Sequence, residues 1–236
     1  MSFDLAAHRA DRSLNKPPGR FVFQVKIRNK GREENRYATA LLVSKQYGLF
    51  LSTTHVFTAH CEVAVYIPSS GNYVPLNVPA SSIDWESSLA LGQLAAQHTD
   101  LLDTYSEASF RGVTTNDKRA KISIDGFGDE DEHLLLNGRI LWHQCPYGVT
   151  LPMLEEMWRA ESKWFPTKED REKLYKRFVL LSFGENSGAI ASGSAVIDET
   201  GCVLGIVSRN DGTVGLAINA KDAEKLVITS CRRLQK

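Results

Sequence analysis

Residues 191–208 read ASGSAVIDETGCVLGIVS and contain the strongest structural pattern in the chain. Ser192 enters a turn of small residues that leads into a strand-like run at Ser194–Ile197. After a turn closed by Gly201, a second apolar run follows at Val203–Ser208. Two apolar runs joined by a glycine turn predict an antiparallel hairpin. The small residues beside Ser192 would let another backbone approach its hydroxyl closely.

Short β-type runs separated by turn residues occupy most of the chain. Such a series predicts an all-β barrel or sandwich. Between 134 and 142, the pair Asn137–Gly138 predicts the turn of a further hairpin. The other expected strands are 21–27, 37–43, 49–52, 63–67, 74–78, 89–91, 121–128, 179–182 and 214–218.

Three segments depart from the β pattern. Residues 1–19 are polar and end in KPPG, which predicts a flexible arm. In 151–177, apolar residues recur at helical spacing, which predicts a helical insertion. An amphipathic helix is expected from Ala220 to about Ile228.

The composition restricts the classes of function. Lysine plus arginine equals aspartate plus glutamate at 28 each, so the net charge is zero. This balance argues against non-specific binding of nucleic acid or of membrane surfaces. No apolar run reaches the ~20 residues of a membrane span, and the start lacks the apolar core of a signal peptide, so we expect a cytoplasmic protein. The four cysteines are scattered, so no metal site, disulfide framework or cofactor is expected.

A histidine is the group most needed beside Ser192, since a serine hydroxyl is a good nucleophile only when a base removes its proton. Residues 48–57 read GLFLSTTHVF and place His55 after an apolar run and a small polar turn. His60 lies in the following loop and is a second candidate. We favour His55 because the strand-to-turn context precedes it directly.

The histidine and serine segments together resemble those of the trypsin-like serine peptidases, in particular the bacterial and viral members without disulfides. The histidine precedes the serine in the chain, as in that family. The resemblance implies that Ser192 is the nucleophile, that His55 is the general base and that the substrate is a polypeptide. It also implies an active cleft between two barrels.

The fold implied by the resemblance consists of two six-stranded antiparallel β-barrels. The first would span about 20–115 and the second about 118–219. The insertion 151–177 and a closing helix within 220–236 would be additions to them.

The position of the third catalytic residue departs from the family pattern. The family has an aspartate before a Leu-Ala-Leu strand, and here Ser88 precedes Leu89–Leu91. Asp84 and Glu86 lie just upstream, and a shifted loop would be needed to bring either to His55. Asp84, Glu86 and Ser88 therefore remain the candidates.

The oxyanion hole also departs from the pattern. Its backbone N–H groups would come from Ile190, where the family has glycine, and from Ser192 itself. Ser187 offers an alternative nucleophile turn in ENSGA, but its distance to Gly201 fits less well. The segment Val207–Ser208–Arg209 resembles the strand that pairs with an extended substrate.

Two functions follow from these residues. In the first, the protein is a serine endopeptidase with an atypical third catalytic residue. In the second, it is a pseudopeptidase whose cleft binds a peptide or a partner protein without cutting it. The presence of His55 and Ser192 favours the first, and the absent aspartate together with Ile190 favours the second.

Overall fold

The computed structural model describes residues 21–29, 35–57, 61–128, 132–145, 167–183, 190–210 and 214–235. The predicted arm 1–19, residues 151–166 of the predicted insertion, and the alternative residues His60 and Ser187 lie outside them.

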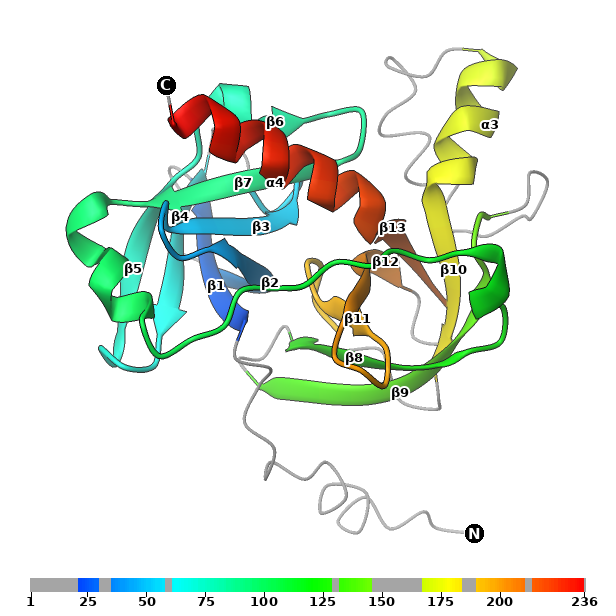
Figure 1. Ribbon diagram of the computed structural model, residues 1–236, viewed down its shortest axis with the longest axis horizontal. Helices are drawn as coiled ribbons and strands as arrows, with labels where there is room; N and C mark the ends of the chain where they lie inside the picture. Colours follow the sequence, from blue (N-terminus) through cyan, green and yellow to red (C-terminus); the bar gives the residue numbers. More distant parts are fainter. Residues whose placement is uncertain are drawn as a thin grey trace, which may run out of the picture.

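The described strands form two closed six-stranded antiparallel barrels, which lie side by side in Figure 1. This confirms the all-β, two-barrel prediction. In the first barrel the order is β3-β2-β1-β4-β5-β7, and pairing of β3 with β7 closes it. A two-residue strand, β6 (Ile83–Asp84), adds to β7. The barrel strands are β1 (Val22–Asn29), β2 (Asn35–Ser44), β3 (Leu49–Thr53), β4 (Cys61–Ile67), β5 (Asn72–Asn77) and β7 (Leu89–Leu94).

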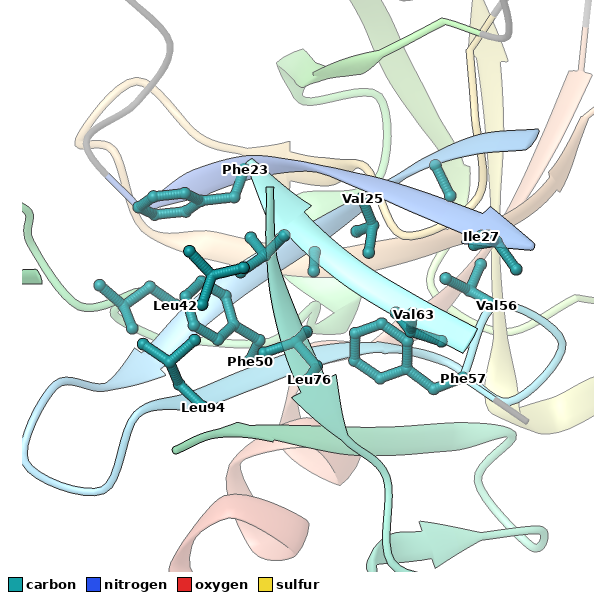
Figure 2. Packing of buried hydrophobic residues seen from close by; sticks show 14 of the residues in the cluster. Phe23, Val25, Ile27, Leu42, Phe50, Val56, Phe57, Val63, Leu76 and Leu94 are labelled. Carbon is teal, nitrogen blue, oxygen red and sulfur yellow. The ribbon is translucent and has the colours of Figure 1, made fainter. Parts of the chain in front are cut away.

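The interior of the first barrel is built by alternation along its strands, as β4 illustrates. Val63, Val65 and Ile67 are buried, while the residues between them are partly exposed. They pack with Phe23, Phe50 and other side chains in the cluster of Figure 2. Burying each such side chain contributes about 1.5–3 kcal/mol before entropic costs. The barrel is therefore a packed core rather than an open pore.

The second barrel has the order β10-β13-β12-β11-β8-β9. The hairpin predicted from residues 191–208 is confirmed as β11 and β12, which pair antiparallel. A helix, α3 (Lys168–Arg177), leads directly into β10 (Figure 1). The strands are β8 (Lys121–Phe127), β9 (His133–Trp142), β10 (Phe178–Phe183), β11 (Ala195–Ile197), β12 (Val203–Asn210) and β13 (Val214–Asn219).

The turn predicted at Asn137–Gly138 is wrong, because both residues lie inside the continuous strand β9. Gly138 pairs with Ile122 on one side and with Phe183 on the other. A Cβ atom on Gly138 would lie 2.7 Å from the carbonyl oxygen of Ser182. Here glycine permits the close approach of β10 and does not mark a turn.

A separate apolar cluster joins the barrels to each other. It contains Leu51 and Leu91 from the first barrel and Ile206 and Leu216 from the second. The closing helix α4 (Ala220–Leu234) lies against both barrels in Figure 1 and inserts Ala223 into this cluster. The closing helix is thus confirmed, and it continues past the predicted end at Ile228. No helix among the described ranges is long and apolar enough to cross a membrane.

The connection between the barrels, from the end of β7 to the start of β8, contains two 3-10 segments and is fastened by Arg111. Its guanidinium donates to Asp117 at 2.9 and 3.3 Å and to Asp198 at 3.0 Å. Asp198 lies in the β11–β12 turn, so Arg111 ties the connection to the predicted nucleophile hairpin. The two segments are η2 (Ala96–Leu102) and η3 (Thr115–Asp117), and a further 3-10 segment, η1 (Ala80–Ser82), lies between β5 and β6.

Candidate active site

Hydrogen bonds to several backbone groups hold the turn that carries Ser192. The Ile190 carbonyl accepts from Asn210 at 2.8 Å, and the Ala191 N–H donates to Phe127 at 3.0 Å. The Ser192 carbonyl accepts from Thr39 at 3.0 Å. Among the described residues, no acceptor faces the N–H groups of Ile190 and Ser192. These are the two donors that the sequence assigned to the oxyanion hole.

Gly193, next to the predicted nucleophile, allows the two barrels to touch. Its φ is +91°, and its N–H donates to Val207 at 2.8 Å. A Cβ atom at this position would overlap the carbonyl oxygen of Thr39 and lie 2.5 Å from Ser52 Oγ. Only glycine therefore fits between the second barrel's turn and β2 of the first barrel.

Thr39 is the junction between the nucleophile turn and the first barrel. Besides its N–H bond to Ser192, its carbonyl accepts from the Ser52 hydroxyl at 2.7 Å. Its hydroxyl accepts from the Phe127 N–H at 2.8 Å and lies 3.2 Å from Ser194 Oγ. Thr39 is itself fully buried, and its bonds to Ser192 and Phe127 fix how the two barrels meet.

The sequence reasoning missed Thr39. The available signal was a polar residue within the apolar run 37–43, since a fully buried threonine needs partners. Nothing in the sequence named those partners, which come from the other barrel.

His55 follows β3, as the sequence predicted, and its turn is anchored on both sides. The next residues, Val56 and Phe57, are buried in the first barrel core, and their N–H groups donate to the Thr53 carbonyl. The Thr54 N–H donates to Ser88 at 3.0 Å. The imidazole Nε2 lies 3.4 Å from Thr53 Oγ1.

The electrostatic surroundings disfavour the charged form of His55. The side chain of His55 is exposed to solvent, although nearby protein atoms partly bury the ring. This burial, followed by the positive charges of Arg209 and Arg36, lowers the pKa of His55 to about 4. The imidazole is therefore neutral at pH 7 and is a weak base.

His55 and Ser192 line the same pocket, which has a volume of about 320 Å³. The structure thus brings together two residues from different barrels, as predicted. The Ser192 hydroxyl donates to the Ser208 carbonyl at 3.0 Å, and within the described chain no hydrogen bond joins it to His55. The other lining residues are Ile27, Asn35, Arg36, Tyr37, Ala38 and Val56.

The candidates for the third catalytic residue have other partners. Asp84 accepts from the N–H groups of Glu86 and Ser87 at 3.0 and 3.3 Å and from the Ser87 hydroxyl at 2.6 Å. Glu86 is paired with Arg177 of α3. Ser88 is buried, with a φ of +58°, and offers its carbonyl rather than its hydroxyl to the histidine turn. In the described chain no carboxylate is hydrogen-bonded to His55.

The predicted substrate strand lies at the end of β12. Strand β11 pairs with β12 only as far as Ile206, and the Val207 carbonyl then accepts from Gly193. Beyond this point, Ser208 and Arg209 border the nucleophile turn with no described strand beside them on that side. Among the described residues, no group of three His, Cys, Asp or Glu side chains is placed to hold a metal ion.

Comparison with solved structures identifies the architecture. The Rv3671c protease of M. tuberculosis in its active form matches 97% of this chain and 87% of its own, with 16% identity and a TM-score of 0.62. The same protein in its inactive form matches with 17% identity, coverage of 97% of each chain and a TM-score of 0.57.

The HtrA-type protease AlgW, solved with a tripeptide, matches 94% of this chain and 62% of its own, with 17% identity and a TM-score of 0.59. The chain has the trypsin-like serine peptidase fold. No family profile and no curated protein sequence matches it. At these identities the likeness concerns the trypsin-like fold alone.

Proposed function

We propose that the protein is a serine endopeptidase in which Ser192 attacks the substrate carbonyl and His55 accepts the serine proton. One observation carries the proposal: His55 and Ser192, from different barrels, line one pocket. The order of the two residues and the trypsin-like fold agree with it.

The contact between Ser192 and Ser208 suggests how the reaction would begin. An extended peptide that adds beside β12 would offer a backbone N–H to the Ser208 carbonyl. It would compete with the Ser192 hydroxyl, which now occupies that acceptor at 3.0 Å. Rotation about the serine χ1 would then direct the hydroxyl toward His55.

The chemical steps then follow from the groups in place. The hydroxyl proton passes to the imidazole as the Oγ–carbon bond forms, and the backbone N–H groups of Ile190 and Ser192 bind the oxyanion. The imidazolium returns the proton to the leaving amine as the carbon–nitrogen bond breaks. The acyl group is then held on Ser192 as an ester. A water molecule, deprotonated by the same histidine, attacks this ester, and the histidine returns the proton to Ser192 Oγ as the carboxylic acid leaves.

The orientation of His55 is the weakest part of this machinery. A buried carboxylate normally fixes the imidazole tautomer and stabilises the imidazolium. Here the neighbour of the ring is the Thr53 hydroxyl, which supplies no charge. We therefore expect slow turnover compared with a complete triad.

A fluorophosphonate probe tests the proposal, because it labels only an activated serine. We expect labelling of the wild-type chain that is lost in Ser192→Ala and in His55→Ala. Ser81→Ala, a change at a serine outside the pocket, is the matched control and should label like the wild type. Absence of labelling over hours would reject the endopeptidase.

The second candidate function is a peptide-binding pseudopeptidase. It is favoured by the lack of a described carboxylate at His55 and by the Ser192 hydroxyl being turned to Ser208. In that case, peptides would bind the cleft while the probe leaves Ser192 unlabelled. Measuring both fluorophosphonate labelling and peptide binding therefore separates the two functions.

A further inference from the structure

A hollow on the outer face of the second barrel contains two exposed cations. Its volume is about 510 Å³, and it shares no lining residue with the pocket of His55 and Ser192. Three neighbouring strands supply its polar lining, which consists of Lys121 of β8, Asn137 and Arg139 of β9, and Ser182 of β10.

Strand alternation and register bring these polar side chains together. Ile122, which follows Lys121, is buried in the barrel core, and Ile140, which follows Arg139, is buried in the same core. Because successive side chains of a strand point to opposite faces, both cations point out of the barrel. Pairing places Lys121 directly opposite Arg139, and Arg139 directly opposite Ser182. The three side chains therefore form one row across β8, β9 and β10.

The two positive charges of this row face each other without a described counter-charge. The Cβ atoms of directly opposite residues lie about 4.5–5.5 Å apart, so the Lys121 ammonium and the Arg139 guanidinium repel each other. Among the described residues, neither cation has an ion-pair partner, and no carboxylate lines the hollow. Asp125, the one acid of β8 and β9, is four residues from Lys121, roughly 13 Å along the strand. Asp117, before β8, is occupied by Arg111.

We propose that this hollow binds the phosphoryl group of a small molecule. The planar guanidinium of Arg139 would hold two of its oxygens, and Lys121 would add a point charge at the third. The Asn137 amide and the Ser182 hydroxyl are neutral donors on the same face. A phosphoryl group offers three acceptor oxygens and about 1.5–2 negative charges at pH 7, which match the donors and the two cations. A carboxylate offers two oxygens and one charge.

A small ligand fits the hollow better than a nucleic acid does. A nucleic acid binds through many phosphates, each neutralised by a cation along its path. The described hollow supplies only Lys121 and Arg139, and the chain has a net charge of zero. The inference is independent of the proposed endopeptidase, because it uses neither His55 nor Ser192.

Thermal unfolding of the full chain gives the first test. The probes are inorganic phosphate and phenyl phosphate, and potassium chloride at the same ionic strength is the reference. We expect the phosphoryl compounds to raise the unfolding midpoint more than chloride does, since a ligand of the native state stabilises it. Benzoate, which has the ring of phenyl phosphate but a carboxylate, should raise it less. A response to phenyl phosphate alone would assign the site to phosphate esters, and a response to inorganic phosphate alone would assign it to the free ion.

Titration calorimetry with charge variants identifies the groups responsible. We expect a dissociation constant below about 1 mM for the preferred phosphoryl compound. Arg139→Gln and Lys121→Gln should each weaken binding at least about tenfold, because each removes a charge-assisted hydrogen bond. Arg139→Lys keeps the charge without the planar fork and should give an intermediate affinity. Arg232→Gln, on the exposed end of α4, is the matched control and should bind like the wild type.

The repulsion between the two cations predicts a further signature. In phosphate-free buffer at low salt, Arg139→Gln and Lys121→Gln should each unfold at a higher temperature than the wild type, since like charges directly opposite destabilise a sheet. Phosphate should no longer raise the midpoint of either variant. A merely structural role of these side chains would instead lower both midpoints, and the same measurement shows that the variants fold.

Several outcomes would overturn the proposal. These are no phosphoryl compound binding below about 1 mM, equal affinity for phenyl phosphate and benzoate, unchanged binding in both glutamine variants, and tighter binding of a single-stranded oligonucleotide than of phenyl phosphate. Phosphoryl binding should be unchanged in Ser192→Ala. Absence of fluorophosphonate labelling with phosphoryl binding intact would reject the endopeptidase and leave this inference standing.

Discussion

Replacing Gly193 by alanine is the sharpest test of how the nucleophile turn is seated. The added Cβ would overlap the Thr39 carbonyl oxygen and come within 2.5 Å of Ser52 Oγ. Since real Cβ contacts below 3.0 Å essentially do not occur, the turn or β2 must move. That movement breaks the bonds from Gly193 to Val207 and from Thr39 to Ser192.

The magnitude follows from these contacts. A positive φ costs a residue with a Cβ about 1–2 kcal/mol. Two buried backbone hydrogen bonds add about 0.5–1.5 kcal/mol each. We therefore expect Gly193→Ala to lower the free energy of unfolding by about 2–5 kcal/mol, a large share of the ~5–15 kcal/mol of a typical domain.

Gly201→Ala is the matched control. Gly201 has a similar φ of +85°, but nothing lies within 4 Å of its Cβ position. It should therefore cost only the conformational term of about 1–2 kcal/mol. Urea unfolding followed by tryptophan fluorescence measures both. Equal losses in the two variants would refute the seating of the turn against Thr39.

Two further outcomes concern pH. Labelling of Ser192 should continue down to about pH 5 and fall to half near pH 4. The reason is that burial and the charges of Arg209 and Arg36 lower the pKa of His55 to about 4, and only the neutral ring is a base. A labelling midpoint near pH 6.5 would contradict this. Arg111→Gln should lower the free energy of unfolding at pH 7 by about 1 kcal/mol, a value that allows for the exposure of this side chain. Burial alone would raise the pKa of Asp117, but hydrogen bonds from Arg111 and Thr114 lower it below the ordinary value of 3.8. The stabilisation from the Arg111–Asp117 pair is therefore present above pH 3.8 and is lost as the pH falls through the lowered pKa. Acid titration of both proteins by circular dichroism should show the difference shrinking below about pH 4, and a constant difference would argue against the pairing.

The parts of the fold that the sequence predicted are those encoded by local pattern. The run 191–208 places two apolar strands around a glycine turn, and they became β11 and β12. The apolar run before His55 became β3 in the same way. Asn137–Gly138 shows the limit of this reasoning. Its local preference for a turn is overridden by pairing with β8 and β10, and sequence alone does not reveal such partners.

In the candidate site, too, the features set by local sequence were predicted and those set by distant partners were not. The sequence named His55 and Ser192, and the structure places both on one pocket. The sequence did not predict that the Asp84 carboxylate would accept hydrogen bonds within its own turn, because that turn depends on the position of β6 relative to β7. It also did not predict the rotamer of Ser192, which is set by the distance to the Ser208 carbonyl in another strand.

The apolar cluster between the barrels has a consequence for how this protein can change during evolution. Leu51 and Ile206 belong to different barrels but share one buried environment with α4. Separating the barrels would expose that surface to water on both halves, so neither half is a self-sufficient module. Substitutions that adapt one barrel to a new ligand are therefore constrained by the packing of the other, and new specificity is more easily gained at the rim of the cleft than by exchange of a whole barrel.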